Sequence, residues 1–172
     1  MTSTETRGTG TRGAWTRGLG ISLVRTEASS ILEAPALARA LADGIAHGYD
    51  GPLHEYPDDA EWYVIREARP AGGIDVGVAV LVPRWPAPHE AALFAVAIAP
   101  EHRGRATASK ALLVIERRLR REGIARLLAR VPRTNGRGLY FMLRVGYTPV
   151  PPSDTPPGED GDVTWFARGG RN

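Results

Sequence analysis

The stretch that most constrains the fold is an apolar run that leads through a turn of small residues into a helical pattern. The run AALFAVAIAP has the length of a buried strand and ends at Pro100. After the turn EHRGRA, the apolar residues Leu112, Ile115 and Leu119 recur at helical spacing over about Ala106–Glu122. Such a junction points the N–H groups of the first helical turn outward, where they can bind phosphate. Two interpretations stay open at this point: a phosphate cradle, or a plain corner in the core.

The rest of the chain alternates between strand and helix patterns. One helix is expected from Ser29 or Ser30 to about His47, and another over 135–145. Arg118, with the neighbouring Arg117, Arg120 and Arg121, is expected on a solvated outer face of the long helix. The resulting element order predicts an α/β fold with a mixed sheet, whose strands cover 21–26, 62–67, 73–82, 89–98, 125–131, 147–150 and 163–167.

Length and composition predict a single domain with a short tail. A chain of 172 residues can bury a sizeable core without stabilising disulfide bonds or a structural metal ion. Residues 1–20 repeat Thr-Arg-Gly three times and hold few apolar side chains, so we expect a flexible tail there and one domain over 21–172. An RNA-binding arm is the alternative for this tail, although a net charge of +3 does not favour nucleic acid as a partner.

Several classes of protein are disfavoured by what the sequence lacks. With no cysteine, the chain has no disulfide framework, thiolate metal site or cysteine nucleophile, and a cytoplasmic location is expected. The four histidines show no i, i+4 pairing, so we expect no metal site. No apolar run is long enough to span a bilayer, so no membrane partner is expected.

Two motifs carry a resemblance to a known family. The turn Arg103–Ala108 reads RGRATA, which resembles the acetyl-CoA motif Gln/Arg-x-x-Gly-x-Gly/Ala. A second motif consists of an asparagine, a helix and then the pair Gly-Phe/Tyr. After the next strand, Asn135 and the pair Gly146-Tyr147 match it. In this order the motifs resemble the GCN5-related N-acetyltransferases (the GNAT superfamily), most clearly over Leu93–Val150. The run LFAVAIAPEHRGR is also similar to the bacterial ribosomal-protein N-terminal alanine acetyltransferases.

The resemblance implies a fold and a site for the acyl donor. It implies a mostly antiparallel sheet, flanked by helices, whose fourth and fifth strands diverge around acetyl-CoA. The pantetheine arm would pair with the fourth strand, and backbone N–H groups of the turn would hold the pyrophosphate. Alanine at 106 and 108 is acceptable if both residues are already helical, because their N–H groups are unchanged. The expected acyl-CoA contacts are Val96, Ala97, Ile98, Arg103, Gly104, Arg105, Ala106, Thr107, Ala108, Ser109 and Asn135.

The catalytic side chains of the family are missing from their usual positions. The position of the usual general-acid tyrosine holds Met142, and that of the alanine acetyltransferases' glutamate base holds Arg130. Glu90, His54 and Glu55 are candidates for replacement groups. The activity that the resemblance implies is that of an N-acetyltransferase, monomeric or homodimeric. Its acceptor would be a peptide α-amine or a small amine such as a metabolite or antibiotic. A non-catalytic acyl-CoA-binding module is the alternative.

Overall fold

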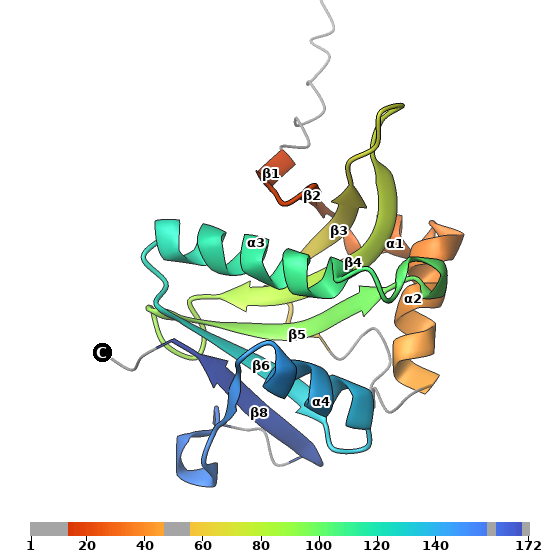
Figure 1. Ribbon diagram of the computed structural model, residues 1–172. Helices are drawn as coiled ribbons and strands as arrows, with labels where there is room; N and C mark the ends of the chain where they lie inside the picture. The colour runs from red at the N-terminus through yellow and green to blue at the C-terminus, as the bar shows by residue number, and fades with distance from the viewer. Residues whose placement is uncertain (1–13, 47–55, 158–160, 170–172) are drawn as a thin grey trace, which may run out of the picture.

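The computed structural model describes residues 14–46, 56–157 and 161–169, and it shows one eight-stranded sheet with helices on both faces (Figure 1). Neighbouring strands in the order β1-β2-β3-β4-β5-β6-β8-β7 are antiparallel except for the parallel pair β5–β6. The predicted α/β class and mixed, mostly antiparallel sheet are confirmed. The strands are β1 (Ala14–Gly18), β2 (Ile21–Thr26), β3 (Glu61–Glu67), β4 (Ile74–Pro83), β5 (Glu90–Ile98), β6 (Arg126–Pro132), β7 (Thr148–Pro149) and β8 (Val163–Arg168).

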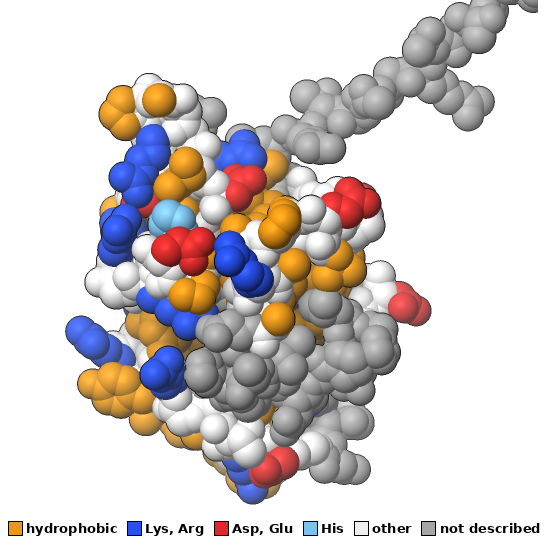
Figure 2. Space-filling view, turned by 90° about the vertical axis from the view of Figure 1, so that its right-hand side faces the viewer, with side chains coloured by type: hydrophobic (Ala, Val, Ile, Leu, Met, Phe, Trp, Pro, Cys, Tyr) orange, Lys and Arg blue, Asp and Glu red, His pale blue; other side chains and the backbone are white. Residues whose placement is uncertain are grey.

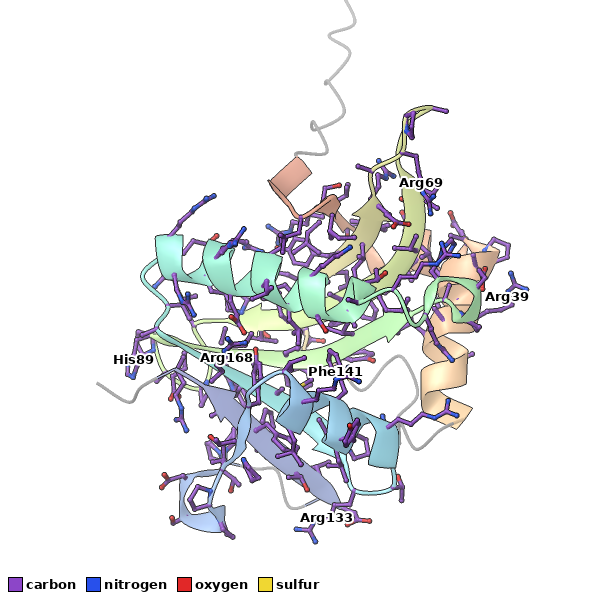
Figure 3. The ribbon with its side chains drawn as sticks, in the orientation of Figure 1. Arg39, Arg69, His89, Arg133, Phe141 and Arg168 are labelled. Carbon is purple, nitrogen blue, oxygen red and sulfur yellow. The ribbon has the colours of Figure 1, made fainter. Side chains whose placement is uncertain are left out.

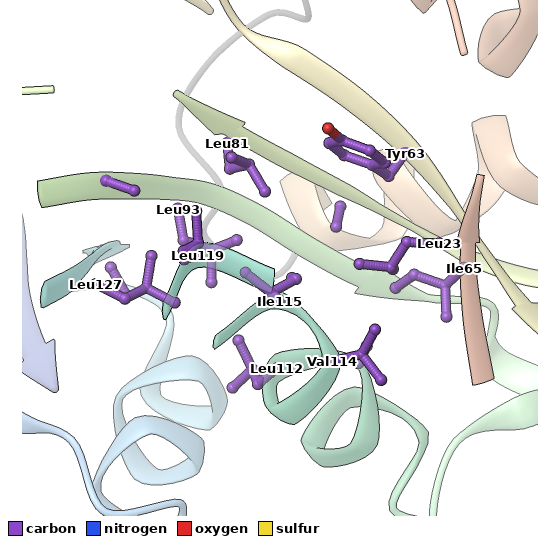
Figure 4. Packing of buried hydrophobic residues seen from close by; sticks show 14 of the residues in the cluster. Leu23, Tyr63, Ile65, Leu81, Leu93, Leu112, Val114, Ile115, Leu119 and Leu127 are labelled. Carbon is purple, nitrogen blue, oxygen red and sulfur yellow. The ribbon is translucent and has the colours of Figure 1, made fainter. Parts of the chain in front are cut away.

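The helices divide the apolar core into two clusters, one on each face of the sheet. Helices α3 (Thr107–Arg121) and α4 (Gly136–Arg144) cover one face, and the short α1 (Ala28–Leu32) and α2 (Pro35–Ala46) pack on the other. The predicted α3 core residues Leu112, Ile115 and Leu119 are buried in a cluster that also holds residues of β2, β3 and β5 (Figure 4). Because β4 and β5 are covered on both faces, their sequences are almost continuously apolar.

The first helical segment differs from its prediction. A single helix to about His47 was expected, but α1 ends at Leu32 and α2 begins at Pro35. Proline has no N–H to donate and disfavours helical backbone at the residue before it, whereas it is well accepted as the first residue of a new helix. The break therefore follows from Pro35.

The expected tail also ends earlier than residue 20. Ala14–Gly18 forms β1 and pairs antiparallel with β2, while residues 1–13 lie outside the described part. The connecting residues Leu19 and Gly20 both have positive φ, at 57° and 75°, as a two-residue type I′ hairpin turn requires. Backbone pairing with the free edge of β2 needs no apolar side chains, so composition alone did not predict this strand.

The expectation of a fully solvated arginine face on α3 is wrong for Arg118. Its side chain is buried, donates to the hydroxyl of Tyr63, and lies 3.0 Å from Glu61 and 2.7 Å from Glu122. Arg117 is exposed, as expected. A guanidinium can be buried here because carboxylates on β3 and at the end of α3 compensate its charge. Among the described residues, no helix has the length and apolar character needed to cross a bilayer.

Candidate active site

The sheet opens between β5 and β6, as the resemblance implied. The two strands pair only from Glu90↔Arg126 to Leu93↔Ala129, and the rest of β6 pairs with β8 alone. At the point of separation, β5 has a bulge: Leu93 faces Leu81 and Ala95 faces Val80, so Phe94 has no partner on β4. The backbone of β5 beyond Leu93 thus forms an inner edge of the sheet, open toward β6.

A cavity of about 520 Å³ fills this opening. Its walls come from β5, the turn before α3, β6, the inner side of α4, and Ala40 and Leu41 of α2. Figure 3 shows Phe141 on the side of α4 that faces α3 and β5. The cavity is a groove that runs along the open edge of β5 and is bordered by residues of α2, α3 and α4.

The turn before α3 is held in place by backbone and side-chain contacts. After the 3₁₀ turn Pro100–His102, the Arg103 Nε donates to the carbonyl oxygen of Ile98 at 2.8 Å, which ties the turn to the end of β5. Gly104 has a positive φ of 76°, where glycine is favoured. The helix begins at Thr107, so consecutive N–H groups point outward from the start of α3 toward the cavity.

The condition that Ala106 and Ala108 are both helical is not met at Ala106. Ala108 lies in α3, as expected, but Ala106 is the N-cap residue and has the left-handed conformation, with φ 57° and ψ 17°. Alanine in this conformation is strained by contact between its Cβ and the backbone. The acetyl-CoA motif has glycine at the position of Ala106, and this is the sign of a left-handed residue that the sequence offered.

Asn135, one of the residues expected to contact acyl-CoA, is the N-cap of α4. Its side-chain oxygen accepts from the N–H of Gly138 at 2.8 Å and caps α4, and the residue also lines the cavity. A Cβ built on Gly138 would lie 2.9 Å from the Asn135 Nδ2 and 3.0 Å from a methyl group of Val131. Because glycine at 138 has no Cβ, the amide group of Asn135 fits at the wall of the groove without steric overlap.

Most of the residues expected to contact acyl-CoA come together around the cavity. Arg105 is the exception, because it is exposed and lies outside the cavity wall. Reasoning from sequence missed Arg137, Phe141 and Arg144 of α4, although their spacing of four and three residues places them on one helix face. The predicted residues in the wall are Val96, Ala97, Ile98, Arg103, Gly104, Ala106, Thr107, Ala108, Ser109 and Asn135.

Comparison with known proteins gives a match at the level of the family. The family model described as the acetyltransferase (GNAT) family matches residues 36–147, which include the groove and both motifs. The chain belongs to the GNAT acetyltransferase family. No curated protein matches it.

Solved acetyltransferase structures share the fold at low sequence identity. An acetyltransferase from Thermus thermophilus is 19% identical, with a TM-score of 0.65, over 88% of this chain and 97% of the other. A GCN5-related N-acetyltransferase from Brucella melitensis is 15% identical, with a TM-score of 0.65, over 90% of this chain and 77% of the other. A GNAT acetyltransferase from Elizabethkingia anophelis, solved with acetyl-CoA bound, is 12% identical, with a TM-score of 0.56, over 88% of this chain and 99% of the other.

The groove of this GNAT chain has few groups that can transfer protons. Met142 and Arg130, the residues at the usual acid and base positions, both line it. Within the described residues, the wall contains no aspartate, glutamate, tyrosine or lysine, and its ionisable side chains are His102 and four arginines. His102 is half-buried, and its Nδ1 has no hydrogen-bond partner in the part of the chain that the structure describes.

The replacement candidates do not supply these groups from the described residues. Glu90 is buried in an ion pair with Arg126 at 2.7 Å and lies outside the cavity wall. Its neighbour His89 is at the end of the sheet away from the turn before α3 (Figure 3). His54 and Glu55 lie outside the described residues. Within the described ranges, no cluster of three or more histidine or acidic side chains could hold a metal ion.

Proposed function

We propose that this GNAT chain transfers the acetyl group of acetyl-CoA to an amine by direct attack. The observation that carries the proposal is the opening of the sheet at Phe94, where a bare strand edge meets the N-terminal turn of α3 in one groove. The edge can pair with the amides of an extended pantetheine arm, and the turn can hold a pyrophosphate through backbone N–H groups. The family, and a family structure that holds acetyl-CoA, support the same donor.

The chemistry requires one bond to form and one to break. The amine nitrogen attacks the thioester carbon, the carbon–sulfur bond breaks with its electron pair on sulfur, and coenzyme A leaves as a thiolate. The nitrogen loses one proton to solvent water as the amide forms. A backbone N–H of β5 near the bulge would stabilise the negative charge that develops on the carbonyl oxygen. A simple thiol has a pKa of about 8.5, so the sulfur can leave without a proton from the protein.

The described wall offers no carboxylate, tyrosine or lysine as a base, and its histidine, His102, lies in the turn proposed to hold the pyrophosphate. This favours an acceptor that is already neutral. With a pKa of about 7.7–8.0, an α-amine is roughly one-third neutral at pH 7.5, whereas a lysine amine with a pKa of about 10.4 is neutral in roughly one molecule in a thousand. We therefore propose a peptide α-amine or another weakly basic amine as acceptor. The first of these agrees with the resemblance to the ribosomal-protein alanine acetyltransferases.

Calorimetric titration with acetyl-CoA and with coenzyme A tests the donor site. Release of the coenzyme A thiol then tests transfer, and the protein contributes no background because it has no cysteine. We expect micromolar binding and faster thiol release with peptides whose only amine is the N-terminus than with N-blocked peptides that carry lysine. A preference for lysine would contradict the acceptor class.

The same lack of carboxylate, tyrosine and lysine side chains in the described wall supports a second function, that of a non-catalytic acyl-CoA-binding module. Tight binding without transfer to any member of a broad amine panel would establish it. Absence of binding would refute both functions.

A further inference from the structure

The charges around the groove are of one sign. Four arginines line the described part of the cavity wall and no carboxylate does: Arg103 in the turn, Arg130 on β6, and Arg137 and Arg144 on α4. Figure 2 shows Lys and Arg side chains gathered on its left, which is the side toward the viewer of Figure 1, where α3 and α4 lie. This potential suits a ligand that carries several negative charges.

The arginines differ in what they already contact. Arg103 donates to the backbone of Ile98, which gives it a structural part in holding the turn. Arg137 and Arg144 are exposed, and neither makes a hydrogen bond or ion pair with another residue of the described chain. Their guanidinium groups are available to a ligand.

The position of Arg137 is unfavourable for the helix itself. It follows Gly136 in the first turn of α4, at the positive end of the helix dipole, and that turn contains no acidic residue. A cation there is destabilising unless an anion lies near it. Arg144, in the last turn, is favourable to the helix, so only Arg137 has a charge that helix stability does not explain.

The two arginines lie on the same face of α4 with an aromatic ring between them. They are seven residues apart, which is about 10 Å along a helix, and Phe141 is between them on the cavity wall. Both side chains are long enough to converge over this ring. The arrangement presents two planar donors, each able to bind phosphate oxygens in a bidentate manner.

We propose that Arg137 and Arg144 bind the 3′-phosphate of coenzyme A, and so select the donor over forms that lack this group. The inference rests on the proposed function. The turn before α3 is the place for the pyrophosphate, and the 3′-phosphate is the other anionic group of the molecule. Because this phosphate is far from the thioester, the arginines act on donor affinity and leave the transfer step unchanged.

The test compares acetyl-CoA with 3′-dephospho-acetyl-CoA by calorimetry at low ionic strength. The proteins are the unaltered chain, Arg137→Gln, Arg144→Gln, the double variant and the control Arg121→Gln, which removes an exposed arginine of α3 outside the cavity wall. Melting temperatures within about 4 °C of that of the unaltered protein verify that the variants fold, since each helix-dipole charge is worth less than about 1 kcal/mol. We expect each α4 variant to bind acetyl-CoA about tenfold more weakly, and to bind the dephospho form as the unaltered protein does.

Equal losses for the two donors would overturn the assignment to the 3′-phosphate, and so would α4 variants that behave like Arg121→Gln. If the unaltered protein binds neither donor, the proposed function fails and this inference fails with it. A normal affinity of the unaltered protein for acetyl-CoA, with no preference over the dephospho form, would overturn the inference alone.

Discussion

The left-handed conformation of Ala106 gives a prediction in which two similar substitutions have opposite effects. Left-handed backbone costs a non-glycine residue about 1–2 kcal/mol, whereas glycine adopts it freely. Glycine also adds about 0.4–1 kcal/mol of conformational entropy to the unfolded chain. Because Ala106 is exposed, loss of its methyl group forfeits little packing. Ala106→Gly should therefore raise the free energy of unfolding by about 0.5–1 kcal/mol.

Ala108→Gly is the matched control, two residues further along the chain. Ala108 is helical, half-buried and packed against the core, so glycine there gains no relief of strain and loses about 1 kcal/mol. The two variants should differ by about 1.5–2 kcal/mol, which corresponds to a difference of about 4–6 °C in melting temperature for a domain of this size.

Urea unfolding and thermal melts of the two variants, without ligand, measure this difference. If Ala106→Gly destabilises the protein as much as Ala108→Gly does, residue 106 is not strained, and the account of the turn is wrong. If both variants are neutral, the turn is too mobile to hold a defined cradle. Either result would remove the structural basis for a preformed phosphate site.

Three further predictions concern the supports of the site. Gly138→Ala should destabilise the protein by about 1 kcal/mol and weaken donor binding, because the new Cβ displaces the cap residue Asn135. Gly136→Ala is the control, since a Cβ there meets open space, and it should change neither stability nor binding. Equal effects of the two variants would count against steric contact as the cause. Arg118→Ala should lower the free energy of unfolding in urea by about 3–5 kcal/mol, because it leaves Glu61 and Glu122 without their buried partner. Replacement of the exposed Arg117 by alanine should change it by no more than about 0.5 kcal/mol, and an equally small change for Arg118→Ala would refute the buried network. Burial and then the charge of its neighbouring carboxylate raise the pKa of Tyr147, so its contribution to stability is complete below about pH 10 and is lost as the unfolded state ionises above that pH. Urea unfolding between pH 9 and 11.5 should show a smaller loss for Tyr147→Phe, and identical pH slopes would contradict the shift.

Local patterns in the sequence were sufficient for the elements that build the groove. The apolar run of β5, the small-residue turn and the periodicity of α3 each depend on residues close in sequence, and they occur where they were expected. The cap at Asn135 is equally local, because one side chain and the next helical turn define it. The break at Pro35 was also readable from sequence, since proline acts on its immediate neighbours.

Tertiary structure decided what depends on residues far apart in the chain. Arg118 is buried only because β3 brings Glu61 and Tyr63 to α3, 57 and 55 residues away. Ala14–Gly18 is a strand only because β2 offers it a free edge. The groove lacks carboxylates within its described wall because the sheet opens beside α4 and leaves Glu90 at the other end of β5. Sequence thus determined the family and the local frame of the site, while side-chain burial and charge followed from which segments the fold brings together.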